Sequence, residues 1–464
     1  MDTLFELPEA KPGKTPEPTR PEVARLYRPV RNQLELVPRE LDSLLAEDHV
    51  ARAIWAFLEK LDLSGFYASI KAVLAHPGHP ASDPKVLLGL WLLATVDGVG
   101  KARQLDRLCH EHDAYRWLRG GVPVNYHLLA DFRVSHQQQL DELMSQILAA
   151  MMSAGLVTLR HVAQDGMRVR ASAGTGSFRR KQRLEGYLEV ARSEVARLAQ
   201  EQDCPETPRS RKQQAAQERA AREREERLEK ALENLPKIQE AREKRAKKDS
   251  LAKRARQQEA RVSMTDPEAR VMRMPDGGFR PAFNLQFATD VDSQVIVGVE
   301  ATNKGSDAGL AVPMVEQIEK RLEAQPEGIL FDNGFATRED ITALTRKGIV
   351  VYAPPPSPRK QPTEPKEPTE PTEPKEPTEP KEGADQAVGA RGDTPEVVQW
   401  RERMRTEEAK TIYRERAATA EWVNAQAREM GLTQLVVRGT AKVLSTLLLV
   451  AIAHNLMRWL SMTT

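Results

Sequence analysis

One stretch near the end of the chain organises the rest of it: Tyr413-Arg-Glu-Arg-Ala-Ala-Thr-Ala-Glu421-Trp-Val-Asn-Ala-Gln-Ala-Arg428-Glu-Met-Gly431. It is rich in Ala, has no internal Gly or Pro and closes on Gly431, which predicts a helix with a C-terminal stop. At about 100° per residue, Glu421, Asn424 and Arg428 share one face of that helix. A carboxylate beside a guanidinium suits a place where a metal meets a phosphate chain. On an isolated helix, however, such a face is more often a solvated ion pair.

Composition sets broad limits on the protein. Its 464 residues are enough for two or three domains with a substantial core. The 69 Lys and Arg nearly balance the 67 Asp and Glu, so charge alone does not indicate a nucleic-acid partner. Two cysteines, Cys109 and Cys204, supply neither a disulfide framework nor a metal-ligand pattern. No signal peptide is recognised, and the longest apolar run, 443–456, is too short to span a bilayer. We therefore expect a soluble, cytoplasmic protein with a buried helix at 443–456.

The first third of the chain is predicted to be a tail followed by a helical domain. Residues 1–30 combine many Pro and charged residues with few large apolar ones, which predicts disorder. Residues 31–155 show short helical patterns and predict an all-helical N-terminal domain. Its segment 98–133 carries basic residues around a Gly turn: Lys101, Arg103, Arg107, Arg116, Arg119 and Arg133. They indicate either a helix-turn-helix-like DNA reader or the solvated faces of an ordinary bundle.

From residue 156, β-rich segments replace the helical ones. Asp165-Gly166 lies between two such segments, which is a strong hairpin signal. Asp165, followed by Arg168 and Arg170, also suits a metal ligand at a strand end beside a phosphate backbone. From the residues alone, the turn is the better interpretation.

Two segments interrupt the β-rich region. Residues 178–262 are dominated by Arg, Glu, Lys, Ala and Gln with a heptad-like apolar spacing. This predicts an inserted, charged helical hairpin, a coiled coil, which is solvated or contacts DNA. Residues 354–396 open with repeated Glu-Pro-Thr and Glu-Pro-Lys triplets. Proline at every third position predicts a semi-rigid polyproline spacer.

Strand and helix patterns alternate between the two interruptions. Residues 279–290 and 294–300 predict an antiparallel pair, Asp307 is expected to begin a helix, and a short buried strand ends at Asp332. A further helix and strand follow, so the predicted fold class is mixed α/β with a helical segment at the end. Three carboxylates gathered by such a fold would suit two Mg²⁺ ions in phosphoryl transfer, although spacing alone does not establish this.

Several segments resemble bacterial insertion-sequence transposases of the DDE class, and most closely the IS eleven-eighty-two family. They are Gln164-Asp-Gly-Met-Arg-Val-Arg-Ala-Ser-Ala-Gly174, Thr265-Asp-Pro-Glu-Ala-Arg270, Phe279-Arg-Pro-Ala-Phe-Asn-Leu-Gln286, Phe331-Asp-Asn-Gly334, Tyr352-Ala-Pro-Pro-Pro356 and 413–431, with Glu47-Asp-His-Val-Ala-Arg52 and Asp131-Phe-Arg-Val-Ser-His136 in the N-terminal domain. The resemblance covers most of the chain except the tail, the spacer and much of the insertion. It implies a helical DNA-binding domain at 31–155 and an RNase H-like catalytic domain at 156–464.

The resemblance also implies a site. The acidic trio of the family falls on Asp165, Asp332 and Glu421, as catalytic residues and as ligands of Mg²⁺, for which Mn²⁺ is a possible substitute. The predicted DNA contacts are Tyr413, Arg416, Arg428, Arg168, Arg170, Lys101 and Arg103. Four residues, rather than the commoner three, separate Arg416 from Glu421, and this turns Arg416 by about 100° relative to the usual pattern.

The function implied is that of a DNA transposase. It would bind the terminal inverted repeats of its element and catalyse Mg²⁺-dependent strand cleavage and strand transfer into target DNA. Handling two ends implies a homodimer or a larger assembly on DNA, associated with the nucleoid and not with a membrane. Three alternatives stay open: a non-catalytic DNA-binding protein, an RNase H-like nuclease that cuts without joining, and a structural coiled-coil protein.

Overall fold

The mixed sheet that follows from these patterns is present in the computed structural model, which describes residues 38–68, 70, 72, 80–203, 211–248, 259–355 and 393–463. The predicted tail at 1–30 and nearly all of the predicted spacer at 354–396 lie outside the described residues. Of the described residues, those from 41 onward form one compact unit.

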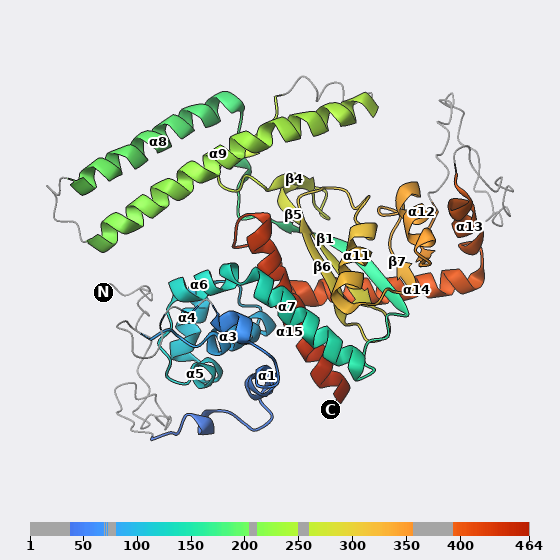
Figure 1. Ribbon diagram of the computed structural model, residues 1–464, viewed down its shortest axis with the longest axis horizontal. Helices are drawn as coiled ribbons and strands as arrows, with labels where there is room; N and C mark the ends of the chain where they lie inside the picture. Colours follow the sequence, from blue (N-terminus) through green and yellow to red (C-terminus); the bar gives the residue numbers. More distant parts are fainter. Residues whose placement is uncertain are drawn as a thin grey trace, which may run out of the picture. The chain divides into compact units, whose positions relative to one another are not determined.

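The main sheet has six strands in the order β4-β5-β1-β7-β8, with β6 also beside β5 (Figure 1). The strands are β1 (His161–Arg170), β4 (Arg270–Arg273), β5 (Phe279–Asp290), β6 (Ile296–Thr302), β7 (Gly328–Leu330) and β8 (Val350–Tyr352). Strands β1, β4, β5 and β6 pair antiparallel, whereas β7 runs parallel to β1 and β8 runs parallel to β7. This arrangement confirms the predicted mixed α/β class.

Strand β1 corrects the interpretation of Asp165-Gly166 as a turn. It is one strand of ten residues, in which Asp165 pairs with Phe287 and Gly166 with Gln286. Gly166 is needed for space: an added Cβ would lie 2.8 Å from Asp307 Oδ1 and would also press on Gln286. The glycine therefore marks a close approach inside a sheet.

The N-terminal region is helical, as predicted. Its helices are α1 (Val50–Leu58), α2 (Ser64–Tyr67), α3 (Pro84–Val96), α4 (Ala102–Glu111), α5 (Asp113–Arg119), α6 (Tyr126–Ser135) and α7 (Gln137–Ser153), preceded by a 3-10 turn, η1 (Asp42–Leu44). Side-chain caps begin four of them, including α3 and α6. Asp83 accepts a hydrogen bond from the Lys85 N–H at 2.8 Å before α3, and Asn125 accepts one from the Leu128 N–H at 3.0 Å before α6.

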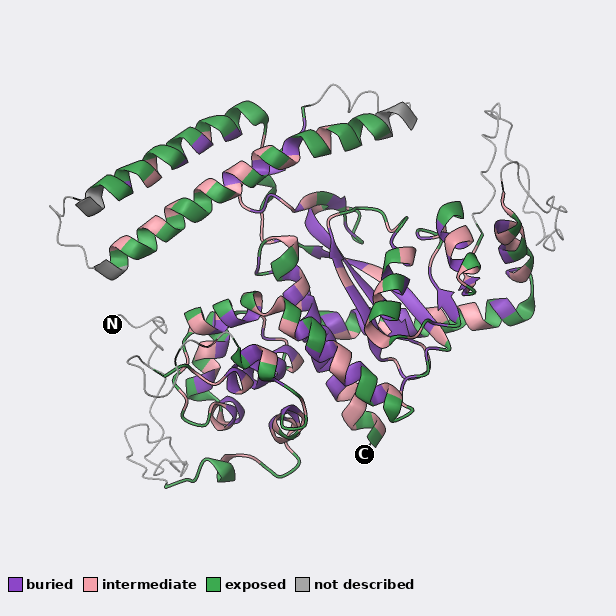
Figure 2. Ribbon diagram, viewed as in Figure 1, coloured by how far each residue is buried: buried purple, intermediate pink, exposed green. Residues whose placement is uncertain are grey.

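Helix α15 (Thr440–Thr463) joins the helical region to the sheet. It packs against α3, α6, α7 and β6, and its middle is buried (Figure 2). Buried Asn455 binds the backbone of β6 twice, donating to Ile296 O and accepting from the Ile296 N–H, each at 2.8 Å. One core therefore runs from the N-terminal helices through α15 to the sheet. The helix is long and apolar enough to cross a membrane, but 67% of its most apolar window is buried, which agrees with the predicted core helix.

Residues 178–262 contain the predicted pair of helices, α8 (Lys181–Asp203) and α9 (Arg211–Lys248). At their base, β2 (Phe178–Arg179) pairs antiparallel with β3 (Val262–Ser263). The two helices share an apolar stripe on facing sides, which includes Leu184, Leu188, Ala191, Leu228 and Leu235. The salt bridge between Lys230 and Glu268, at 3.1 Å, ties α9 to the segment before β4. A supercoil between the helices stays a prediction.

The remaining helices are α11 (Ala311–Leu322), α12 (Arg338–Arg346), α13 (Pro395–Arg403) and α14 (Glu407–Glu429). Helix α11 begins at Ala311, so the prediction that Asp307 begins a helix is wrong. Gln164 of β1 donates to Leu310 O beside α11 at 3.2 Å, whereas the next residue, Asp165, contacts α14. Because consecutive strand residues point to opposite faces, α11 and α14 cover opposite faces of β1.

Candidate active site

Asp165 and Asp332 are brought together by the register of two parallel strands. Ala163 of β1 is paired with Leu330 of β7. Asp165 and Asp332 each lie two residues farther along, and an interval of two returns a side chain to the same face of the sheet. The loop after β7 holds Asp332 in place, because its Oδ1 accepts a hydrogen bond from the Gly334 N–H at 2.8 Å.

Helix α14 brings Glu421 to the same place. Asp165, Asp332 and Glu421 all line one pocket of about 560 Å³, together with Asn424 and Arg428. The predicted face of the helix, with Glu421, Asn424 and Arg428, is therefore the face that meets the two aspartates. Glu421 itself is exposed, whereas Asn424 is buried. The pocket thus combines residues from β1, the loop after β7 and α14.

Both carboxylate oxygens of Asp165 have partners on α14. Arg416 donates to Oδ1 at 3.0 Å and Asn424 Nδ2 donates to Oδ2, also at 3.0 Å. Burial raises the pKa of Asp165, the Arg416 guanidinium and the Gly166 N–H oppose that rise, and the nearby charges of Asp332 and Asp307 add to it. The pocket therefore concentrates negative charge, and Arg416 partly compensates it.

Asp307 is a residue that the sequence did not single out for the site. It lines the same pocket, and its Oδ1 accepts hydrogen bonds from Asn284 at 2.6 Å and Gln286 at 2.9 Å. Its Oδ2 lies 3.9 Å from the Arg168 guanidinium. The signal that could have found it is the alternation of Asn284 and Gln286 within the otherwise apolar segment 281–288, since two buried amides on one face need polar partners.

The predicted basic contacts on the sheet and on α14 differ in their surroundings. Arg168 lines the pocket but donates to the backbone carbonyls of Arg273 at 3.3 Å and Gly305 at 3.1 Å. Arg428 is exposed at the pocket. Arg170 is exposed in a separate groove that is also lined by Phe279.

Tyr413 and Arg416 lie deeper than the exposed basic residues. The side chain of Arg416 is 15% exposed and is paired with Asp165. Tyr413 is half-buried, and its burial raises the pKa of its hydroxyl. The DNA contacts predicted for these residues stay predictions.

In the N-terminal region, Lys101 and Arg103 are exposed, and the Arg103 guanidinium lies 4.9 Å from the centre of the Tyr126 ring. Arg133, by contrast, is buried, which corrects its expected place on an exposed basic face. It stacks on Trp91 at 4.5 Å and donates to Gly100 O at 2.6 Å. Burial lowers its pKa to about 10.

The donor atoms of the pocket fit a hard divalent cation in their chemistry. Carboxylate oxygens of Asp165, Asp307, Asp332 and Glu421 line it, and Asn424 Oδ1 is buried without a hydrogen-bond partner. Among the residues that the structure describes, however, no three His, Cys, Asp or Glu side chains stand close enough together to form a ready metal site. The Arg416 guanidinium is hydrogen-bonded to the Asp165 carboxylate instead.

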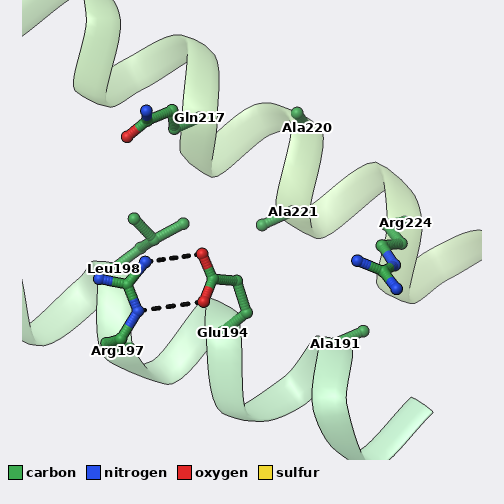
Figure 3. A pocket seen from close by; sticks show the side chains of 8 residues that line it. All are labelled: Ala191, Glu194, Arg197, Leu198, Gln217, Ala220, Ala221 and Arg224. Carbon is green, nitrogen blue, oxygen red and sulfur yellow. Dashed lines mark hydrogen bonds and ion pairs between the residues drawn. The ribbon is translucent and has the colours of Figure 1, made fainter. Parts of the chain in front are cut away.

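Another hollow, of about 360 Å³, lies between α8 and α9 (Figure 3). Its one lining carboxylate, Glu194, is bound to Arg197 of the same helix at 2.7 Å. The rest of its lining includes Ala191, Leu198 and Ala221. This hollow lacks the converging acids of the pocket at Asp165.

Comparison with known families bears on both ends of the chain. A family described as "Transposase DDE domain" matches residues 386–460, and one described as "Transposase domain (DUF772)" matches residues 39–135. The two matches indicate an insertion-sequence DDE transposase. The first match contains α14 and the second contains Lys101 and Arg103, whereas Asp165 and Asp332 lie outside both.

Neither the comparison with curated proteins nor that with solved structures gives a match. The assignment of this transposase therefore rests on its two matched domains. Its family acts on DNA and typically uses a divalent metal. The finer placement in the IS eleven-eighty-two family stays a prediction.

Proposed function

We propose that this transposase binds the terminal inverted repeats of its element, cuts a DNA strand at the element end with Mg²⁺, and joins the freed end to target DNA. The observation that carries the proposal is the convergence of Asp165, Asp332 and Glu421 on one pocket from three elements that are distant in the sequence. A strand residue, a loop residue and a helix residue with only structural roles have no common reason to meet. A metal-binding pocket gives them one.

Asp165, Asp332 and Glu421 are the proposed metal ligands, with Mn²⁺ as a substitute metal. When bound, the metal supplies positive charge that activates the attacking oxygen and stabilises the leaving oxygen of the phosphodiester. Arg428 is exposed and lines the same pocket, and its planar guanidinium presents a fork of donors that suits phosphate oxygens. Arg168 is held by backbone carbonyls and also brings positive charge to the pocket that it lines.

The DNA contacts are proposed to extend over both the N-terminal helical region and the region that contains the sheet. Residues 31–155 form the DNA-binding domain, with Lys101 and Arg103 as phosphate contacts, and residues 156–464 form the catalytic domain. Tyr413, Arg416 and Arg170 are proposed to add contacts near the pocket. Two element ends require a homodimer or a larger assembly on DNA. We place the protein in the cytoplasm, associated with the nucleoid.

The test is a nicking and strand-transfer assay on labelled DNA that carries the ends of the element. Asp165→Ala, Asp332→Ala and Glu421→Ala are each expected to abolish both reactions while DNA binding persists. Glu415→Ala is the matched control for Glu421, because it removes an exposed carboxylate from the same helix outside the pocket. Its activity is expected to stay near that of the wild type.

The assay also separates the proposal from its alternatives. A wild-type protein that binds the ends but never cuts would be a non-catalytic DNA-binding protein. Metal-dependent cutting without strand transfer would identify a nuclease. Normal cutting by any one of the three acid variants would remove that residue from the proposed site.

A further inference from the structure

The geometry of α14 sets Asn424 between Arg416 and Glu421. At about 100° per residue, Arg416 lies about 80° from Asn424 around the helix, on the side away from Glu421, and about 140° from Glu421. Arg416 and Asn424 bind the two oxygens of Asp165, whereas Glu421 lines the pocket beyond them. One helix therefore carries one of the proposed metal ligands and both groups that hold another.

Asn424 is unusual for a polar residue in the middle of a helix. It is only 7% exposed, and its Nδ2 donates to Asp165 Oδ2 at 3.0 Å. Its Oδ1 is buried, has no hydrogen-bond partner and belongs to a side chain that lines the acid pocket. An unpaired buried amide oxygen destabilises a fold, so ordinary packing does not explain an asparagine here. Its contact with Asp165 does.

Arg416 makes a different kind of contact with the same carboxylate. Its guanidinium lies 3.0 Å from Asp165 Oδ1, and the two side chains are only 15% and 20% exposed. A full positive charge thus already lies against a carboxylate that the proposed function assigns to a metal. Because like charges repel strongly where water is largely excluded, the guanidinium and a divalent cation would compete for the Asp165 carboxylate.

We propose that Asn424 is a positioning residue for Asp165, and that Arg416 is a resident counter-ion that leaves Asp165 when a divalent cation binds. The inference rests on the proposed function for the metal-ligand role of Asp165. Asn424 keeps the carboxylate in one orientation through Oδ2, the oxygen that Arg416 does not contact. Once displaced, Arg416 is free to contact an incoming DNA phosphate, which reconciles its ion pair with the predicted DNA contact.

The test measures Mn²⁺ binding to the full chain without DNA, by titration calorimetry and by electron paramagnetic resonance of the bound ion. Arg416→Gln removes the competing charge and is expected to tighten Mn²⁺ binding about tenfold, the factor that corresponds to about 1.4 kcal/mol. Arg416→Lys keeps a positive charge and is expected to stay within about threefold of the wild type, a span of less than 1 kcal/mol. Arg414→Gln is the matched control, because it removes an exposed guanidinium from the same helix.

Asn424→Leu has the opposite expected effect. It removes the donor to Oδ2 and is expected to weaken Mn²⁺ binding by about 10- to 100-fold, as is usual when a residue that orients a metal ligand is lost. Gln426→Leu is its control, because the described contact of the Gln426 side chain is a hydrogen bond to Glu429, away from Asp165. Circular dichroism of each variant establishes that it is folded. The resonance spectrum is expected to change for Asn424→Leu and not for Gln426→Leu.

The two variants at the pocket make the inference easy to overturn. If Asp165→Ala abolishes Mn²⁺ binding but Arg416→Gln and Asn424→Leu both bind like the wild type, the inference fails and the metal site of the proposed function stands. If only Arg416→Gln binds Mn²⁺ measurably, competition is supported. If neither the wild type nor Arg416→Gln binds Mn²⁺ through Asp165, the metal-ligand role of Asp165 fails as well.

Discussion

Gly166 next to Asp165 is the position where one added methyl group tests the link between fold and site. In Gly166→Ala the new Cβ would lie 2.8 Å from Asp307 Oδ1 and 2.9 Å from Asn284 Oδ1, and it would also press on Gln286. These three side chains are bonded to one another: Asn284 and Gln286 both donate to Asp307, and Gln286 also donates to Asn284 at 3.1 Å. One of them cannot move away without breaking a bond to another.

The magnitude follows from three contributions. Forcing a methyl group into a filled space costs about 1–3 kcal/mol. Loss of one hydrogen bond to the charged Asp307 costs about 1.5–3 kcal/mol. The lower entropy of an unfolded chain with Ala returns about 0.4–1 kcal/mol. We therefore expect Gly166→Ala to lower the free energy of unfolding by about 2–5 kcal/mol.

Urea unfolding of the full chain, followed by circular dichroism, measures this loss. Gly174→Ala is the control, because the backbone there is extended, with φ −88° and ψ 154°, and an added Cβ would meet nothing within 4 Å. It is expected to change the free energy of unfolding by less than about 1 kcal/mol. A loss below about 1 kcal/mol for Gly166→Ala would show that the polar cluster yields freely, and the close approach deduced for Gly166 would be refuted.

Three further predictions concern contacts that hold α15 and the end of α14 against the rest of the fold. Asn455→Ala leaves the buried N–H and C=O of Ile296 without partners and is expected to cost about 2–5 kcal/mol in urea unfolding, with faster hydrogen exchange in β6 as the local sign. Burial lowers the pKa of His454 to about 4, so the folded protein keeps it neutral; stability is full above about pH 6.5 and falls by about 3 kcal/mol as the pH drops towards 4. From pH 7 to pH 4.5, the urea midpoint of the wild type is expected to fall more than that of His454→Gln. An equal fall in both proteins would contradict the prediction. In Gly98→Ala, the new Cβ would lie 2.5 Å from Glu429 O on a backbone with φ +70°. The resulting strain of about 1–3 kcal/mol is expected to lower the melting temperature by several degrees. An unchanged melting temperature would mean that this contact with the end of α14 is loose.

The sequence was sufficient where the signal is local. The apolar spacing along α8 and α9 and the C-terminal stop of α14 both depend on residues within a few turns of one another. The mixed α/β class followed from the same kind of pattern. Local patterns also gave wrong answers, because Asp165-Gly166 has the chemistry of a hairpin turn although it lies inside a continuous strand. The reason for its glycine is a contact with β5 and Asp307, which no local pattern contains.

What the sequence determined by itself is a list of candidates: acids that follow buried strands, and a helix face with Glu421, Asn424 and Arg428. Only the tertiary structure decided which candidates meet. The pairing of β1 with β7 aligns Asp165 with Asp332, and the packing of α14 on β1 adds Glu421 while it turns Arg416 towards Asp165. The tertiary structure also added Asp307 to the residues that line the pocket, and it placed Arg133 in the core instead of on an exposed basic face. The physical reason is that strand register and helix packing are set by contacts between residues far apart in the chain, and one residue of shift moves a side chain to the other face.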